Sequence, residues 1–143
     1  HNLAFRLSTP LKAYEAGNVT NGTFRPVTAS NAWVAAFEDK SPCLNLDWES
    51  PQTFNEIVLH FDTDFDHAME TAQWGHPEDV MPFCVRAYVI RDADGSELHR
   101  CSGNHQTINR IRFAESVCTR GLSLELTHPS EQVPAALFGI RIY

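Results

Sequence analysis

The chain has 143 residues, of which 43% are hydrophobic and 10% aromatic, and this is enough for one domain with a packed core. Its formal net charge of -7 argues against a nucleic-acid partner, because the only local basic grouping is Arg110 with Arg112. No apolar run approaches the roughly 20 residues that a membrane-spanning helix needs, so we expect no membrane insertion.

The first predicted element is a short helix at residues 9–16, where Ser8 or Thr9 provides an N-cap and Pro10 takes the first helical position. We assign residues 1–16 to an N-terminal edge segment and residues 17–143 to the domain proper. The first residue is His1, no signal peptide follows it, and the start resembles the cut edge of a longer chain.

Strand signals dominate the rest of the chain. In five runs, apolar residues alternate with polar ones, and this period of two predicts strands with one buried and one wet face. Turn residues separate the runs. Many short strands without a long helix predict an all-β fold, an antiparallel β-sandwich. The runs are residues 43–48, 57–62, 84–90, 122–127 and 138–143, and the turns are Asn21-Gly22, Ser50-Pro51, Asp94-Gly95, Ser102-Gly103 and His128-Pro129.

The four cysteines are scattered and form no C-x-x-C pair, so we expect no structural zinc site. Cys84 and Cys101 flank the hairpin predicted around Asp94-Gly95, but they are not opposite each other if that hairpin closes symmetrically. We interpret all four as free thiols without a catalytic role, since nothing local marks a low-pKa thiolate. They are Cys43, Cys84, Cys101 and Cys118.

Several short motifs follow one another along the chain. They are Asn-Val-Thr-Asn-Gly at 18–22, Asn-Ala-Trp at 31–33, Leu-Asn-Leu-Asp-Trp at 44–48, Tyr-Val-Ile-Arg-Asp-Ala-Asp-Gly at 88–95 and Leu-Phe-Gly-Ile-Arg-Ile-Tyr at 137–143. Their order resembles the discoidin-type domain, also called the coagulation-factor C-type domain. The resemblance covers about residues 17–143 and implies a galactose-binding-like jelly roll.

A narrower resemblance rests on residues 61–67, 76–78, 84–85 and 103–106. These motifs are similar to a C-terminal domain appended to some bacterial FAD-dependent oxidoreductases, and the likeness implies an accessory module rather than a reaction. The chain has no Gly-rich phosphate loop, so a flavin would belong to another domain and we expect no organic cofactor here. An extracellular or periplasmic location is favoured for such a module.

The discoidin resemblance also implies a structural calcium ion near the first turn, which many members hold with an Asp in that turn and a Glu in the last strand. The matching positions here are Asn21 and Gly139. Each change removes a negative charge from a site for a hard cation and leaves Thr23 and main-chain carbonyls as ligands. We therefore expect weak or absent calcium binding at this turn.

A second candidate cation site is the acidic segment after the predicted strand at residues 57–62. Asp62, Asp64, Asp66 and Glu70 supply carboxylates close together, as calcium prefers. Their spacing matches no recognised calcium loop. The alternative is that some of them pair with arginines, and the candidates for this pairing are Arg86, Arg110 and Arg112.

The same segment carries the residues that we assign to ligand binding. Trp74 offers an aromatic face for the apolar side of a sugar ring, while His76 and Glu78 offer hydrogen bonds to hydroxyls. The alternative for Trp74 is a cover over the end of the sandwich. A second polar loop, which could meet the first at that end, consists of Asn104, His105 and Gln106.

We interpret the chain as a non-catalytic carbohydrate-binding module from a larger bacterial protein, with carbohydrate and the other domains of that protein as partners. One alternative is a structural docking domain of a FAD-dependent oxidoreductase or a hydrolase, without a ligand of its own. Another is a metal-dependent enzyme that uses residues 62–70, with Asp64 and Glu78 as acid and base. No nucleophile elbow supports catalysis, so we expect no enzyme.

Overall fold

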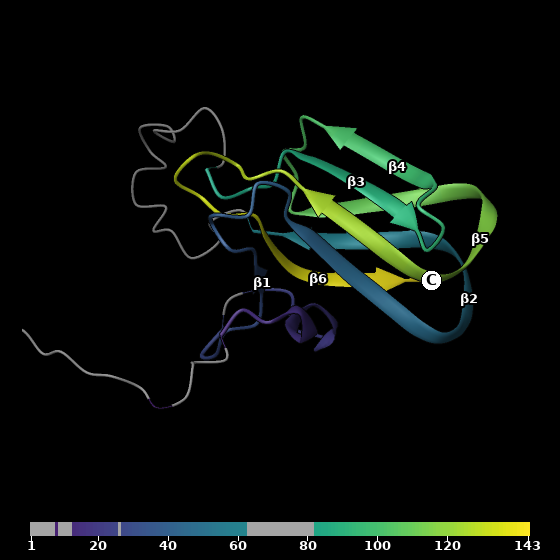
Figure 1. Ribbon diagram of the computed structural model, residues 1–143, viewed down its shortest axis with the longest axis horizontal. Coiled ribbons are helices and arrows are strands. Elements are labelled where there is room, and N and C mark those ends of the chain that lie inside the picture. The colour runs from purple at the N-terminus through teal and green to yellow at the C-terminus, as the bar shows by residue number, and fades with distance from the viewer. Residues whose placement is uncertain (1–7, 9–12, 26, 63–81) are drawn as a thin grey trace, which may run out of the picture.

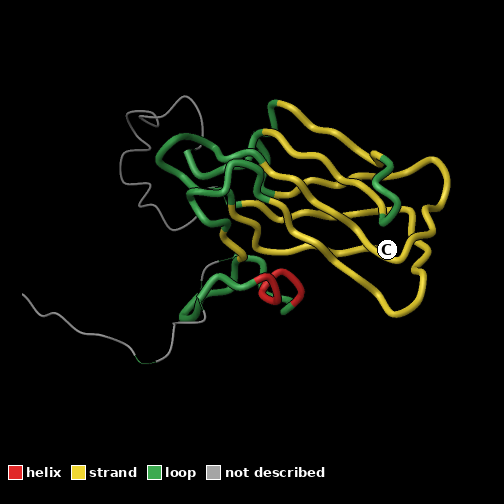
Figure 2. Tube along the Cα trace, viewed as in Figure 1, coloured by secondary structure: helices red, strands yellow, loops and turns green. Residues whose placement is uncertain are grey.

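The computed structural model describes residues 8, 13–25, 27–62 and 82–143, and strands dominate it (Figure 1, Figure 2). In this part of the chain the one helix is η1, a 3-10 helix at Ala16–Thr20, and every strand pairing is antiparallel. The predicted all-β architecture is therefore confirmed. The strands are β1 (Trp33–Val34), β2 (Cys43–Phe61), β3 (Ala87–Asp92), β4 (Glu97–Ser102), β5 (Ile108–Leu126) and β6 (Ala136–Ile142).

Two long strands organise the sheet. β2 and β5 have 19 residues each, and they pair with each other over most of their length. The strand order is β1-β6-β2-β5-β3-β4. β6 pairs with the second half of β2, whereas β3 pairs with the second half of β5. The β2–β5 ribbon therefore belongs to two layers, and Figure 1 shows it turning back between them.

We name the two layers after the strands that flank the ribbon. The β6 layer consists of β1, β6, the second half of β2 and the first half of β5. The β3 layer consists of β4, β3, the second half of β5 and the first half of β2. The fold is thus a sandwich made from one bent sheet.

The hydrophobic core lies between these layers, because alternate side chains of a strand point to opposite faces of its sheet. Ile57, Leu59 and Phe61 of the β6 layer are at most 1% exposed, and so is Ile90 of the β3 layer. Phe61 also meets Tyr88 of β3, with ring centroids 5.3 Å apart. Burial of one large apolar side chain contributes about 1.5–3 kcal/mol, so this contact surface holds the layers together.

The predicted turn at Ser50-Pro51 does not separate two strands. β2 runs through it and ends only at Phe61. Pro51 has no N–H to donate, and the pairing with β5 shifts register between Asp47 and Gln52. This irregular stretch accommodates the proline and lets the ribbon bend. Two alternating runs in the sequence are therefore two halves of one strand.

The predicted helix at residues 9–16 is wrong for the part that the structure describes. Residues 9–12 lie outside the described residues, and residues 13–15 are not helical. Tyr14 has a φ of 62°, in the left-handed region that a right-handed helix does not use. η1 begins two residues later, at Ala16. The division into residues 1–16 and 17–143 stays a prediction.

A substitution at Gly121 can test how closely β2 and β5 approach each other at the bend. A Cβ at this position would lie 2.7 Å from the main-chain oxygen of Leu46. Main-chain atoms of a paired strand give way poorly, so Gly121→Ala should lower the free energy of unfolding by about 1–3 kcal/mol. Urea denaturation followed by circular dichroism measures the change. Gly17→Ala is the matched control, since a Cβ there meets nothing within 4 Å. Equal midpoints for both variants would contradict this close approach.

Candidate functional site

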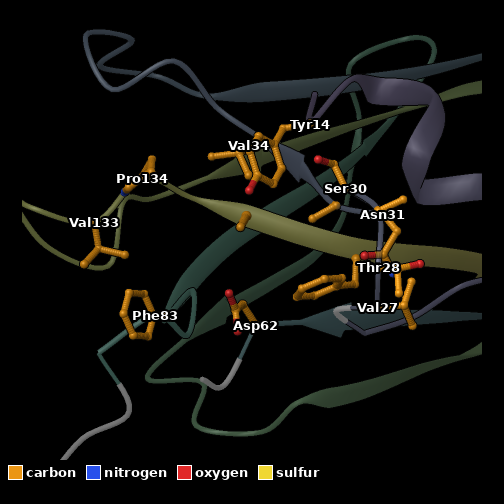
Figure 3. Close-up of a pocket in the computed structure, with 14 residues that line it drawn as sticks. Tyr14, Val27, Thr28, Ser30, Asn31, Val34, Asp62, Phe83, Val133 and Pro134 are labelled. Atoms are coloured by element: carbon orange, nitrogen blue, oxygen red, sulfur yellow. The ribbon is translucent and has the colours of Figure 1, made fainter. Parts of the chain in front are cut away.

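A hollow of about 600 Å³ lies where β2 ends and β6 begins (Figure 3). The loop of residues 27–32 forms one wall, and the residues around the start of β6 form another. Asp62 and Phe83, which flank residues 63–81, line the side that Figure 3 shows opposite Tyr14 and Val34. The hollow is thus assembled from segments that are far apart in the sequence.

The side chains around the hollow combine aromatic surface with oxygen atoms. Tyr14 is 51% exposed and Phe83 is 36% exposed, so both rings are available to a ligand. Thr28 and Ser30 contribute hydroxyls, and Asp62 is the only charged residue among the described residues of the lining. A hydroxyl-rich ligand suits this surface, because aromatic rings and hydrogen-bonding oxygens lie side by side in the lining.

Two asparagines hold the wall of residues 27–32 in place. The Asn18 side chain donates to the carbonyl of Ala32 at 2.8 Å. Asn31 is 4% exposed, and its amide donates to the carbonyls of Thr23 and Arg25. These bonds tie the wall to the segment of residues 18–25 and pair its main-chain carbonyl groups. Asn18 and Asn31 belong to the motifs that carry the discoidin resemblance, so the sequence did mark the supports of the hollow.

The aromatic rim was missed by the sequence analysis. Tyr14 is brought to the rim by a main-chain bond, in which the Val34 N–H donates to the Tyr14 carbonyl at 3.2 Å. Phe83 reaches it because Cys84 and Val85, the next residues, are buried in the core. No periodic pattern marks either aromatic residue. The only sequence signal for Tyr14 and Phe83 is that each is a large aromatic residue outside the predicted strands.

Asn104 was expected to bind ligand, and the structure corrects this. Its side chain is buried at 6% exposure, where it donates to the Val85 carbonyl at 2.8 Å. Its oxygen accepts from the Gln106 N–H at 3.0 Å and from the Asn109 side chain at 2.9 Å. With donors and acceptor in use, Asn104 shapes the loop instead of binding a ligand. His105 and Gln106 are exposed.

The loop around Asn104 lies beside both flanks of residues 63–81. The Phe61 N–H donates to the Thr107 carbonyl at 2.8 Å, and the Asn104 N–H donates to the Arg86 carbonyl at 2.8 Å. The second loop is thus bonded to residues on either side of the first, and the meeting of the two loops stays a prediction. The remaining predicted residues of that segment lie outside the described residues, and these are Asp64, Asp66, Glu70, Trp74, His76 and Glu78.

Among the described residues, no group of three His, Cys, Asp or Glu side chains could hold a metal ion. Of the predicted acidic cluster only Asp62 is described, and it lines the hollow. Arg110 and Arg112 pair with Glu56, and pairing of the acidic segment with Arg86 or these arginines stays a prediction. All four cysteines are free.

The residues at the expected calcium position near the first turn do not fit a calcium ion. The Asn21 side-chain oxygen accepts from the Thr23 N–H at 2.7 Å and so closes the turn. A Cβ on Gly139 would lie 2.2 Å from the Phe24 ring, so this ring fills the space that a glutamate would need. Phe24 stacks on His60 with centroids 4.3 Å apart and an interplanar angle of 23°.

A cation also covers the Phe24 ring. Cζ of Arg141 lies 4.0 Å from the ring centroid, a distance at which a guanidinium is attracted to the negative face of an aromatic ring. His60 is half-buried in this stack. Burial and the charges of Arg141 and Arg110 lower the pKa of His60 from its ordinary value of 6.5. The stack therefore favours the neutral imidazole.

No family model matches the sequence, and no curated protein matches it either. Solved structures do match. A family 32 carbohydrate-binding module from Streptococcus pneumoniae EndoD is 14% identical, with 96% of this chain and 90% of that one covered and a TM-score of 0.68. CBM32-1 from a family 31 glycoside hydrolase of Clostridium perfringens is 14% identical, with coverages of 93% and 87% and a TM-score of 0.63. The chain therefore has the discoidin-like β-sandwich fold of these modules.

Two further structures show the same fold. Chitosan-binding module 1 from a chitosanase/glucanase of Paenibacillus sp. IK-5 is 14% identical, with coverages of 92% and 86% and a TM-score of 0.61. A Ruminococcus gnavus GH29 fucosidase is 14% identical with a TM-score of 0.62, but the match covers 92% of this chain and only 22% of that one. The narrower likeness to a domain of FAD-dependent oxidoreductases stays a prediction.

The lowered pKa of His60 predicts a pH dependence of stability. The unfolded chain takes up a proton on this residue near its ordinary value of 6.5, before the folded protein does. Stability that is present above about pH 6.5 should therefore be lost as the pH falls from there toward the lower pKa of the folded state. Urea denaturation between pH 8 and pH 5 should show this loss, and His60→Gln should reduce it.

The control for this measurement is His105→Gln, which removes an exposed imidazole outside the stack. A part of the loss should survive in His60→Gln, because burial also lowers the pKa of His99 against the opposing effect of Glu97. Identical pH profiles for the wild type and His60→Gln would contradict the stack.

Calcium should leave the melting temperature unchanged, because the Asn21 oxygen is already an acceptor and Phe24 occupies the space beside Gly139. Differential scanning calorimetry in millimolar calcium and in EDTA measures this. A ligand that binds the folded state tightly would raise the melting temperature by mass action. A rise that EDTA reverses would contradict the expectation, and loss of that rise in Asp64→Asn would assign the ion to residues 62–70.

Proposed function

We propose that the protein is a non-catalytic carbohydrate-binding module and that the hollow beside Tyr14 and Phe83 holds its saccharide. The observation that carries the proposal is the presence of two exposed aromatic rings and the oxygens of Ser30 and Asp62 around one open hollow. An aromatic face packs against the apolar side of a sugar ring, while the oxygens accept hydrogen bonds from its hydroxyls. A rigid sandwich often carries its binding residues on such irregular segments.

The fold supports this proposal by analogy. Its solved neighbours include modules described as carbohydrate-binding and as chitosan-binding. The match to a fifth of a fucosidase chain also supports a module that works within a larger protein, where other domains are its partners. The likeness in fold names no sugar for this chain.

The distribution of exposed apolar residues favours a binding module over a docking domain. A docking domain should present a wide apolar patch. Of the six large hydrophobic side chains that are exposed in the described part of the chain, Tyr14, Val27 and Phe83 line the hollow. The other three are Phe37, Ile108 and Tyr143, which do not line it. Apolar surface is therefore concentrated where a ligand would lie.

The chemistry of the described residues does not favour an enzyme. A nucleophilic cysteine needs a lowered pKa, but burial raises the pKa of Cys84 to about 11. The described residues also contain no cluster of side chains for a catalytic metal ion. These observations support binding without catalysis.

We expect a Kd of roughly 0.1–1 mM for a saccharide, about -4 to -5.5 kcal/mol, because a shallow site makes few contacts. Glycan arrays should identify the sugar, and isothermal titration should then measure affinity. Tyr14→Ala and Phe83→Ala should each weaken binding about five- to thirtyfold, which corresponds to about 1–2 kcal/mol of lost stacking. Phe37→Ala is the matched control, since this ring is 47% exposed and lies outside the hollow.

The same titration can test further residues, some of which lie outside the described part of the chain. We propose Trp74, His76 and Glu78 as further ligand contacts, together with His105 and Gln106. Trp74→Ala should abolish most binding at an unchanged melting temperature; a destabilised variant would make Trp74 a core residue. Full binding in both Tyr14→Ala and Phe83→Ala would overturn the hollow as the site. A folded protein that binds nothing on the array would favour the docking domain.

A further inference from the structure

Three arginines come together on the outer face of the β6 layer. Arg110 and Arg112 lie two residues apart on β5, so their side chains share a face. Val58 of β2 is paired with Arg110 on one side and with Arg141 of β6 on the other. Neighbouring strands are about 4.8 Å apart, so the Cα atoms of Arg110 and Arg141 are roughly 10 Å apart. We call these three residues the arginine face.

The core lies on the other side of this layer. Ile57 and Leu59 point inward and are fully buried, so Val58 points outward. Val58 is nevertheless only 2% exposed, which requires that longer neighbours cover it, as the stems of arginine side chains do. The side chains of Arg110 and Arg112 remain accessible, while one face of the Arg141 guanidinium packs on Phe24. The side chain of Arg110 is 59% exposed and that of Arg112 is 75% exposed.

One carboxylate serves two of these guanidinium groups. Oε1 of Glu56 lies 3.2 Å from Nη1 of Arg110, and Oε2 lies 3.5 Å from Nε of Arg112. Each guanidinium has five N–H donors, so both groups keep donors for a further ligand. The charges of Arg141 and Arg110 also act on His60, where they lower its pKa together with burial. The face is therefore a positive region in a chain whose net charge is -7.

We propose that the arginine face is a second binding site, separate from the hollow, for a linear acidic polysaccharide that carries carboxylates, such as a uronic acid polymer. Guanidinium groups bind carboxylates through two parallel hydrogen bonds, which a neutral sugar cannot match. The three groups lie on β5 and β6, with β2 between these strands, and this spread suits an extended chain with carboxylates at intervals. The glutamate already held between two of them shows that they accept this ligand chemistry.

An acidic peptide is the competing occupant, and the geometry makes it the weaker one. Among the described strands, the first half of β5 has no partner on its outer side, so a peptide strand could pair with that edge. Such a strand would lie about 5 Å beyond β5 and so roughly 15 Å from β6, which carries Arg141. A polymer that crosses the face meets all three arginines. We therefore assign the arginine face to the polymer.

The experiment measures binding of the full chain to polygalacturonate at low ionic strength by affinity electrophoresis and isothermal titration. Arg110→Gln/Arg112→Gln should weaken binding about tenfold or more, through loss of charge-assisted hydrogen bonds. Arg86→Gln/Arg120→Gln is the matched control, because it removes the same charge from exposed arginines outside the face. Equal weakening in both double variants would overturn the site, since it would reduce the effect to net charge.

Glu56→Gln gives a change in the opposite direction. It frees two guanidinium groups from an exposed ion pair, so polygalacturonate should bind about two- to fivefold more tightly. If the arginines served only to keep other strands from pairing with the edge of β5, Glu56→Gln would leave polygalacturonate binding unchanged. That result would overturn the proposal. Binding should also weaken when salt is raised, because exposed charges are screened.

Two further ligands identify the partner class. Fully methyl-esterified polygalacturonate lacks the carboxylates and should not bind, and equal binding of the ester would overturn the proposal. If polyglutamate binds more tightly than the polysaccharide and its binding persists in Arg141→Gln, the partner is a peptide that pairs with the edge of β5. That result would overturn the polysaccharide proposal. Tyr14→Ala should leave polygalacturonate binding intact, so failure at this face and failure of the hollow are separate results.

Discussion

The structure depends on the bend in the β2–β5 ribbon. Because these strands stay paired through the bend, one sheet folds back on itself and its two halves share a core. The bend places Phe61 opposite Tyr88 and gives β6 and β3 their separate halves of the ribbon. It needs an irregular stretch near Pro51 and close contact at Gly121. The hollow and the arginine face both sit on the β6 layer that this bend creates.

The stack of Phe24 with His60 and Arg141 occupies the position at which the discoidin resemblance implies a calcium ion. It ties the segment after η1 to the last strand, across β2. A metal site would need charged oxygens, whereas this stack needs a glycine, Gly139, whose missing side chain leaves room for the ring. The two solutions exclude each other, since a glutamate at this position and the ring of Phe24 would occupy the same space. We therefore expect attachment of the first segment to depend on pH through His60.

Charge divides the molecule into surfaces with different ligands. The described lining of the hollow holds one carboxylate and no cation, while the arginine face holds three arginines, two of which share the carboxylate of Glu56. On our proposals, a saccharide occupies the hollow and an acidic polymer is attracted to the arginine face. A module with both sites could hold a polysaccharide chain at two points, and binding at two linked points strengthens attachment without new contacts at either one.

The sequence alone determined the fold class, because a period of two in apolar residues follows directly from burial of one strand face. Its motifs also marked Asn18 and Asn31, which support the hollow. The tertiary structure decided the rest. Asn104 was expected at the site but is buried, and sequence does not show which polar groups a fold encloses. The register across β5, β2 and β6 brings Arg141 beside Arg110, thirty-one positions away. Such long-range pairing is fixed by how strands pack, which no local pattern contains.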